Sequence, residues 1–310
     1  MRKITADKVY TVQGEPILDG VVVVDNEGRI LDVTDASAHD PASLESHRGV
    51  LVPGFINAHC HLELSHMLGK VDTGTGLIPF LTKVVSFRKE KDEVIQEAIR
   101  NAEEEMINNG IVAVGDISNV PDTFAQKAKG NLHYYTFVEM FDFLQEDRAD
   151  DFFSQYLEVY DKLENSDKNR KSIVPHAPYT VSNNLFGRIA EFNSGSKTTV
   201  SIHNEEMEDE NALFQDKSGR LEAFFAKFGF DISHFEPPGT TSLIHALGCL
   251  DPNQRTLFVH NTLTRPEEIK LAHEWSEDVY WATCPNANLY IENRLPLYQH
   301  FIDRGARVTI

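Results

Sequence analysis

Residues 51–70, LVPGFINAHCHLELSHMLGK, decide the fold we expect. An apolar run over residues 50–58 leads into His59-Cys60-His61. Because the side chains of a strand alternate between its two faces, His59 and His61 point the same way and Cys60 points the other way. Two imidazoles at the end of a strand can share one metal ion. The alternative is a pair of packed or solvated histidines, since short motifs also arise by chance.

Downstream of this stretch, strand-like and helix-like segments alternate. Such alternation favours a parallel sheet, and eight strand–helix units favour a (β/α)₈ barrel with its active site at the carboxyl ends of the strands. We therefore predict an α/β fold, a TIM-like barrel with a small N-terminal β-sandwich domain. The expected strands cover residues 54–61, 111–117, 132–139, 172–176, 198–203, 256–260, 279–284 and 306–310, and the expected helices cover residues 91–109, 150–163, 184–193, 212–227, 266–274 and 296–304.

The N-terminal segment has a different pattern, with short strands separated by turns. Strand-like runs cover residues 4–12, 20–25 and 29–33. Pro53-Gly54 is a turn signal and suggests a domain joint. We predict that residues 1–52 form part of a small β-sandwich and that residues 53–310 form the barrel, which stops at strand eight.

Histidines end several of the predicted strands. His59 and His61 end the first strand, His176 the fourth, His203 the fifth and His260 the sixth. A single histidine in a strand is more often structural than a ligand. Five of them at one end of a barrel are hard to explain in that way, so the pattern predicts a metal-dependent site.

Four motifs, taken together, resemble a known family. They read PGFINAHCHLELS (residues 53–65), VPHAPYTVS (174–182), SIHNEEMEDE (201–210) and FVHNTLT (258–264). In this order they resemble the amidohydrolase superfamily, in its branch of metal-dependent deaminases and chlorohydrolases, which includes S-adenosylhomocysteine, guanine and aminofutalosine deaminases. One departure is VHN in the last motif, where relatives often read AHC or VHC. The resemblance implies the same barrel, and a sandwich completed by strands from the C-terminal part of the chain.

The resemblance also implies a ligand set. His59, His61 and His203 match the histidines that bind one divalent ion in this branch, most simply Zn²⁺, with Fe²⁺ as the alternative. An aspartate after strand eight is the fourth ligand there. Two-metal members carry a bridging lysine at the end of strand four, where this chain has Val174-Pro175-His176, so we expect a single ion. Such an ion lowers the pKa of a bound water toward neutrality.

Two residues match catalytic positions of the branch. Glu206 lies three residues after His203, as in the HxxE pattern of the deaminases, whose glutamate protonates a ring nitrogen and carries protons to the leaving amine. The alternative is a solvated acidic run, because several carboxylates crowd residues 205–210. His260 would polarise the attacking water or stabilise charge in the tetrahedral intermediate, unless it is a core histidine.

Further positions are candidates for contact with substrate. His176 matches a substrate-contacting histidine of the family, or is a core histidine. Glu63 could face the substrate or cap the next loop, and Glu210 resembles a further acid of the pattern HxxExxxE. Asp116 and Glu139 end strands two and three, where substrate would be met. The stretch Cys284-Pro285-Asn286-Ala287-Asn288 resembles a CPxxN turn that shapes the floor of the pocket, or is a plain turn.

Composition excludes several classes of protein. The chain has 310 residues, 41% of them hydrophobic, and a net charge of −19, which argues against nucleic-acid and anionic-membrane partners. Its three cysteines do not resemble a disulfide framework, so a reducing cytoplasm fits. The first residues, MRKITADKVY, lack the apolar core of a signal peptide, and no stretch is long and apolar enough for a membrane span, so we expect neither. The expected partner is a small-molecule substrate, and a homodimer is compatible with the sequence.

The expected activity is hydrolytic deamination of an aminated heterocycle, an aminopurine nucleoside or a related base. Hydrolysis of another C–N or C–Cl bond is the alternative reaction. A non-catalytic assembly protein on the same fold is the alternative class, but such proteins typically lose the metal histidines that this chain keeps.

The end of the chain departs from the family pattern. It stops at Ile310, where family members continue into a turn that carries the metal-binding aspartate. The resemblance implies either a fragment or a protein that lacks its fourth ligand. We expect the 310 residues, as they stand, to bind metal more weakly and not to form a competent enzyme.

Overall fold

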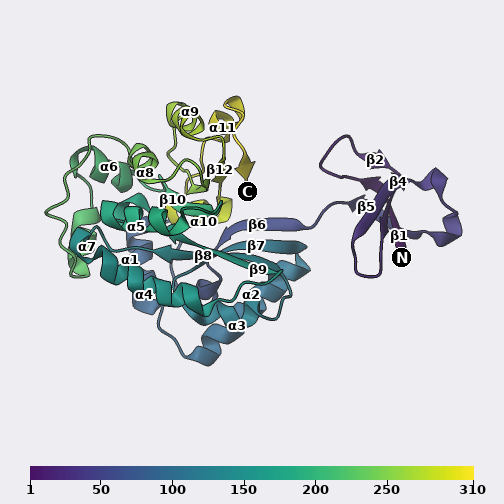
Figure 1. Ribbon diagram of the computed structural model, residues 1–310, viewed down its shortest axis with the longest axis horizontal. Helices are drawn as coiled ribbons and strands as arrows, with labels where there is room; N and C mark the ends of the chain where they lie inside the picture. The colour runs from purple at the N-terminus through teal and green to yellow at the C-terminus, as the bar shows by residue number, and fades with distance from the viewer. The chain divides into compact units, whose positions relative to one another are not determined.

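The computed structural model describes residues 1–310 (Figure 1). The contacts within the chain divide it into two compact units, Met1–Phe55 and Ile56–Ile310. None of the helices combines the length and the apolar character needed to cross a membrane.

The first unit is a curled, mostly antiparallel sheet built around its first strand. That strand pairs antiparallel with the second and third strands and parallel with the fifth. Val9, Val22 and Val24 form its small core. The fifth strand was not among the predicted ones, because its residues ESHRGVL are mostly polar and exposed and show no strand pattern. The strands are β1 (Arg2–Val9), β2 (Ile17–Leu18), β3 (Gly20–Val24), β4 (Ile30–Asp35) and β5 (Glu45–Leu51).

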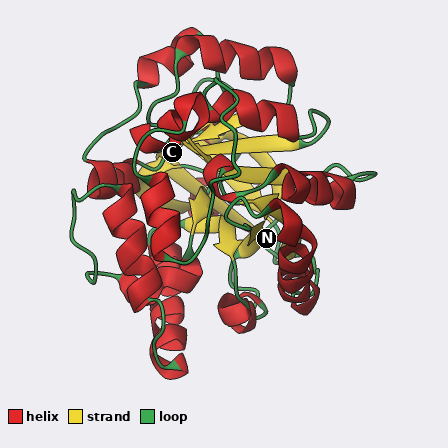
Figure 2. Ribbon diagram, turned by 90° about the vertical axis from the view of Figure 1, so that its left-hand side faces the viewer, coloured by secondary structure: helices red, strands yellow, loops and turns green.

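The second unit contains parallel strands that alternate with helices, as predicted. Its strands form two four-stranded sheets, in the orders β6-β7-β8-β9 and β10-β11-β12-β13, and the hydrogen bond from His203 N to the carbonyl oxygen of His176, 2.9 Å long, links the two at β9 and β10. Figure 2 shows the helices lying around these strands. The strands are β6 (Phe55–Cys60), β7 (Ile111–Ser118), β8 (His133–Met140), β9 (Asn169–Pro175), β10 (Thr199–Asn204), β11 (Arg255–His260), β12 (Val279–Ala282) and β13 (Val308–Thr309).

The helices agree with prediction at most positions, with one clear error. The single helix expected over residues 212–227 is wrong: the chain turns between two helices, where Lys217 and Gly219 have φ of 60° and 91°. Arg220 then pairs with Asp209 and holds this turn. The α-helices are α1 (Leu77–Phe87), α2 (Asp92–Asn108), α3 (Phe124–Lys127), α4 (Ala149–Lys162), α5 (Asn183–Asn193), α6 (Glu208–Asp216), α7 (Leu221–Lys227), α8 (Ser242–Cys249), α9 (Pro266–Trp275), α10 (Pro285–Glu292) and α11 (Tyr298–Asp303).

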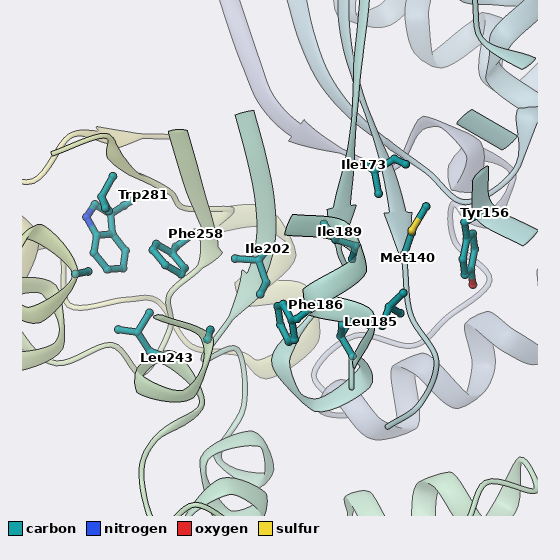
Figure 3. Close-up of a cluster of buried hydrophobic side chains, with 14 of the residues drawn as sticks. Met140, Tyr156, Ile173, Leu185, Phe186, Ile189, Ile202, Leu243, Phe258 and Trp281 are labelled. Atoms are coloured by element: carbon teal, nitrogen blue, oxygen red, sulfur yellow. The ribbon is translucent and has the colours of Figure 1, made fainter. Parts of the chain in front are cut away.

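The largest core cluster lies between the strands and the helices that cover them. Strand register places Ile202, Phe258 and Trp281 opposite one another on β10, β11 and β12, so they form a row, which Figure 3 shows. The rings of Phe258 and Trp281 stack with centroids 5.2 Å apart. Helix α5 begins at the N-cap residue Ser182, whose side chain accepts a hydrogen bond from Leu185 N. Burial of this apolar face fixes the strands whose ends carry the histidines.

Strands β6 and β7 approach each other too closely for a side chain at Gly115. A Cβ atom there would overlap the carbonyl oxygen of Ala58, and it would lie 3.1 Å from the ring of Phe137. Ala58 immediately precedes His59 in β6, so this close approach determines where the first histidine lies.

We expect Gly115→Ala to displace β6 and to destabilise the protein by about 1–3 kcal/mol, as overpacking of a close-packed core does. The measurement is the free energy of unfolding in urea. Gly187→Ala is the matched control, since an added Cβ at that exposed position of α5 meets nothing within 4 Å. Equal effects of the two substitutions would contradict the argument.

Candidate metal centre and active site

Five histidines converge where the strands end, as the sequence predicts. His59 lies near the end of β6, and the others follow or end β6, β9, β10 and β11. The ring centroids of His59 and His61 are 5.0 Å apart, and those of His59 and His203 are 4.9 Å apart. His176 lies 4.8 Å and His260 5.4 Å from His203, measured between ring centroids. His203 is therefore the central member of the group.

Three of these rings have the spacing of ligands to one ion. The ligand atoms of His59, His61 and His203 all lie within 4.8 Å of one another. The Nε2 atoms of His61 and His203 are 3.2 Å apart. Two nitrogens bound to one tetrahedral Zn²⁺, at about 2.0–2.1 Å each, would be roughly 3.3 Å apart. His59 Nδ1 is buried without a hydrogen-bond partner. This arrangement of nitrogens fits a metal site.

Glu139 and a backbone carbonyl determine which nitrogen of His203 is free. His203 Nδ1 lies 2.8 Å from the carbonyl oxygen of His176 and 3.2 Å from the Glu139 carboxylate. Because both neighbours are acceptors, Nδ1 carries the proton, and Nε2 is left to face His61. A carboxylate behind a metal-binding histidine fixes its tautomer and raises its basicity. The structure thus gives Glu139 a contact with His203 instead of the position toward substrate that we expected.

Burial keeps most of the cluster neutral. It lowers the pKa of His61 and His260 to about 3 and that of His176 to about 4, and it lowers the pKa of His59 well below its usual value. Burial acts in the same direction on His203, but the Glu139 carboxylate outweighs it and raises the pKa of His203 to about 9. Neutral imidazole is the form that binds metal ions.

Glu206 is buried beside His260 and does not belong to a solvated run. Its side chain is 5% exposed, and its Oε1 lies 3.7 Å from His260 Nε2. Burial raises the pKa of Glu206 to about 7. The carboxyl group can therefore gain or lose a proton near neutral pH, which a general acid and base requires.

Glu210 supports the turn that carries Glu206. Its two carboxylate oxygens accept hydrogen bonds from Glu205 N, 3.0 Å away, and from Glu206 N, 3.1 Å away. Glu205 has a φ of 45°, a conformation that needs such support. Glu210 is fully buried in these contacts. The contacts of Glu210 are thus with the backbone of Glu205 and Glu206. Its role in binding substrate stays a prediction.

His260 is oriented by a residue of the CPxxN stretch. Asn288 Oδ1 lies 3.2 Å from His260 Nδ1. Since an amide oxygen can only accept, Nδ1 donates, and Nε2 is left with its lone pair toward Glu206. Cys284 is the N-cap of helix α10 and Pro285 its first residue, so the alternative of a plain turn is wrong. Asn261, the departure in VHN, donates from its side chain to the carbonyl oxygens of Phe258 and Ala282.

His176 and Glu63 have different surroundings. The Nδ1 of His176 contacts Thr180 Oγ1 at 2.7 Å, which leaves its Nε2 free. Glu63 is 2% exposed, forms an ion pair with Arg88 and accepts hydrogen bonds from Asn119 N and Val120 N. Burial raises the pKa of Glu63 to about 7. These contacts occupy its carboxylate, and its role toward substrate stays a prediction.

A cavity of about 650 Å³ opens above the histidines. Its polar floor contains all five histidines and Glu206. Its walls come from the short helical turn Leu62–Met67 and the loop that follows it, from α1 and from α10, and most of the side chains that line them are apolar. The wall residues include Leu64, Met67, Leu68, Val71, Leu77, Phe80, Leu81, Val84, Tyr290 and Ile291.

The sequence did not predict the residues whose hydrogen bonds orient the histidines. Glu139 and Asp116 were expected to meet substrate, and Asn288 was read only as part of a turn. No motif singles out a strand-end acid that bonds to a histidine on another strand. The one available signal was their position at the carboxyl ends of strands.

The chain is similar to known proteins over most of its length. The model of the amidohydrolase family matches residues 50–310. The chain belongs to the amidohydrolase family. One relative in sequence is an adenosine deaminase from Helicobacter pylori. It is 26% identical over 264 residues, which make up 84% of this chain. This amidohydrolase spans 63% of the length of that relative.

Solved structures agree on the amidohydrolase fold. The aminofutalosine deaminase of Helicobacter pylori, in complex with methylthio-coformycin, superimposes with a TM-score of 0.84 at 23% identity, over 100% of this chain and 76% of that one. An adenosine deaminase from Xanthomonas campestris with bound zinc gives a TM-score of 0.74 at 21% identity, over 99% and 68%.

We expect Glu139→Gln to lower the affinity for Zn²⁺ or Co²⁺ by about 10–100-fold. Without the carboxylate that contacts its Nδ1, His203 becomes a less basic and less well oriented ligand. Titration of the metal-free protein against a chelating dye measures this. Asp142→Asn is the matched control: Asp142 is also buried and follows β8, but it accepts hydrogen bonds from Ser182. If the two variants bind the ion equally well, Glu139 does not support His203.

Proposed function

We propose that the protein is a metal-dependent hydrolase that deaminates an aminated heterocycle, an aminopurine nucleoside or a related base. The observation that carries the proposal is the buried Glu206, 3.7 Å from His260 Nε2, on the floor that it shares with His59, His61 and His203. A proton donor beside a group of metal-binding histidines suits the departure of ammonia, a poor leaving group without a proton.

The named relatives support the choice of substrate. They include an adenosine deaminase, an aminodeoxyfutalosine deaminase and a 5-methylthioadenosine/S-adenosylhomocysteine deaminase, at 24–26% identity. All of these names denote removal of an amino group. We extend this activity to the present chain as part of the proposal.

We further propose a closed (β/α)₈ barrel for residues 53–310, with residues 1–52 forming part of a β-sandwich. The eight parallel strands and their alternation with helices support the barrel. A single Zn²⁺ held by His59, His61 and His203 is the proposed cofactor, supported by the 3.2 Å separation of two of the ligand nitrogens. The unpaired cysteines suit a cytoplasmic protein.

The proposed reaction replaces an exocyclic C–NH₂ by C=O with consumption of one water and release of ammonia. A bound divalent ion would activate the water by lowering its pKa. Glu206, with a pKa of about 7, donates its proton to the ring nitrogen next to the reacting carbon. The carboxylate that remains takes a proton from the water and passes it to the amino group, which leaves as ammonia. The last O–H proton returns to Glu206 as the C=O bond forms.

His260 orients the attacking water. Asn288 accepts the Nδ1 proton of His260, so the neutral ring presents a lone pair at Nε2, next to Glu206. A lone pair can accept a hydrogen bond from the water but cannot donate one to an oxyanion. Of the two roles expected from the sequence, orientation of the water is therefore the one we propose.

The cavity walls favour a substrate with an apolar substituent. Leucine, methionine, valine and phenylalanine side chains surround the floor, and Glu206 is the one carboxylate among the lining residues, without any lysine or arginine. A charged tail placed there would lose its hydration without gaining a partner. Displacement of chloride is the second candidate reaction, but it needs no proton on the leaving group, so one of the proton transfers proposed for Glu206 would have no use.

The test is a panel of aminopurine nucleosides, free aminopurines and chlorinated heterocycles, assayed with the complete gene product. We expect release of ammonia from the nucleosides, fastest for those with an apolar 5′ group. Turnover limited to chlorinated compounds would contradict the proposal.

We expect Glu206→Gln to retain the metal and to lower kcat by roughly 10²–10⁴-fold, the usual effect of losing a general acid and base. The matched control is Glu208→Gln, two residues on in the same acidic run, whose side chain is 83% exposed. The measurements are metal content and kcat on the best substrate of the panel. A wild-type kcat in the Glu206 variant would place the proton transfers elsewhere.

A further inference from the structure

A lysine lies completely buried behind the metal centre. Lys127, the last residue of α3, has no exposed surface. Its ammonium group contacts Asp116 Oδ2 at 2.6 Å, Ser118 Oγ at 3.1 Å and Thr136 Oγ1 at 2.9 Å. These three partners match the three hydrogens of an ammonium group.

Such a pair is not explained by stability alone. Moving both charges out of water carries a desolvation penalty that their mutual attraction often does not recover, so an apolar pair of similar volume usually serves stability equally well. Both Lys127 and Asp116 are fully buried, and neither reaches the cavity. The pair therefore calls for another explanation.

The second oxygen of Asp116 supplies that explanation. Asp116 Oδ1 accepts a hydrogen bond of 2.8 Å from Leu62 N and one of 3.3 Å from Cys60 Sγ. Cys60 and Leu62 flank His61 on either side. His61 itself lies just beyond the end of β6, with φ of −118° and ψ of 74°.

We propose that Asp116 is a positioning residue for His61 and that Lys127 is its anchor. Lys127 holds Oδ2 of the carboxylate, which aims Oδ1 at the backbone after His61. The imidazole is thereby kept where its Nε2 lies 3.2 Å from that of His203. The inference rests on the proposed function in one respect: it requires that these histidines bind a divalent ion.

Three variants separate positioning from general stability. Lys127→Met removes the anchor. Asp116→Asn with Lys127→Met leaves no unpaired charge and keeps an amide oxygen that can accept the Leu62 N–H. Asp116→Ala with Lys127→Met also leaves no charge but removes that acceptor. Each is titrated, as the metal-free complete gene product, with Co²⁺ against a chromophoric chelator, and the visible d–d spectrum of the bound Co²⁺ is recorded together with the thermal midpoint.

We expect the Ala double variant to bind Co²⁺ roughly 10–100-fold more weakly, the usual loss when an outer hydrogen-bond partner of a ligand is removed. Its d–d spectrum should change with the geometry of His61. The Asn double variant, which keeps the acceptor but lacks the anchor, should bind Co²⁺ more tightly than the Ala double variant and less tightly than the parent, whatever its thermal midpoint. Lys127→Met should lose affinity, and if it does not fold, the two double variants decide the question.

Glu103→Gln is the matched control. Glu103 is a buried carboxylate of α2 that accepts hydrogen bonds from Gln126, Asn131 and Tyr134, and it accepts none from the His61 segment. The Glu103→Gln variant should bind Co²⁺ with the affinity of the parent protein. The inference is overturned if the folded Ala double variant has the affinity and spectrum of the parent, or if the Asn double variant is as impaired as the Ala double variant.

The outcomes distinguish this inference from the proposed function. If the variants follow the expected order and no heterocycle releases ammonia with the parent protein, the positioning role stands and the proposed reaction fails. If the parent deaminates a nucleoside and all three variants bind Co²⁺ as the parent does, the reaction stands and the positioning role fails.

Discussion

The Nε2 atoms of His61 and His203 lie 3.2 Å apart, and the two residues come from different four-stranded sheets. Two imidazole lone pairs at this distance repel each other unless a proton or a cation lies between them. The close approach of β6 to β7 at Gly115 and the link between β9 and β10 hold the two rings at this distance from either side.

Buried acids behind the cluster complete this support. Glu139 contacts His203, Asp116 accepts from the residue after His61, and Glu210 accepts from the backbone of Glu206. In a low-dielectric interior a charged acceptor binds an N–H group more strongly than a neutral one does. These three carboxylates thus hold His203, the backbone after His61 and the backbone of Glu206, and none of the three lines the cavity, whereas Glu206 does.

The five histidines and Glu206 lie on the floor of the cavity, and its apolar side chains lie on its walls. Its floor consists of strand ends, whose positions follow from the core row that includes Phe258 and Trp281. Its walls come from α1, α10 and the turn after His61, segments with apolar side chains on the inner surface. Such walls exclude water from the reacting groups and strengthen the electrostatic interactions among them. Under the proposed function, changes in the walls would alter the substrate while the floor keeps the reaction.

The sequence alone determined the eight strands after residue 53, the convergence of the five histidines and the register of Glu206 after His203, because each follows from local periodicity or spacing. It could not determine the break at Lys217 or the polar strand Glu45–Leu51, which depend on contacts with distant residues. It also could not assign Glu139, Asp116, Glu210 and Asn288 their partners. A carboxylate looks the same in sequence whether it faces substrate or a neighbouring N–H group, and only the packing of the strands in space decides which of these it meets.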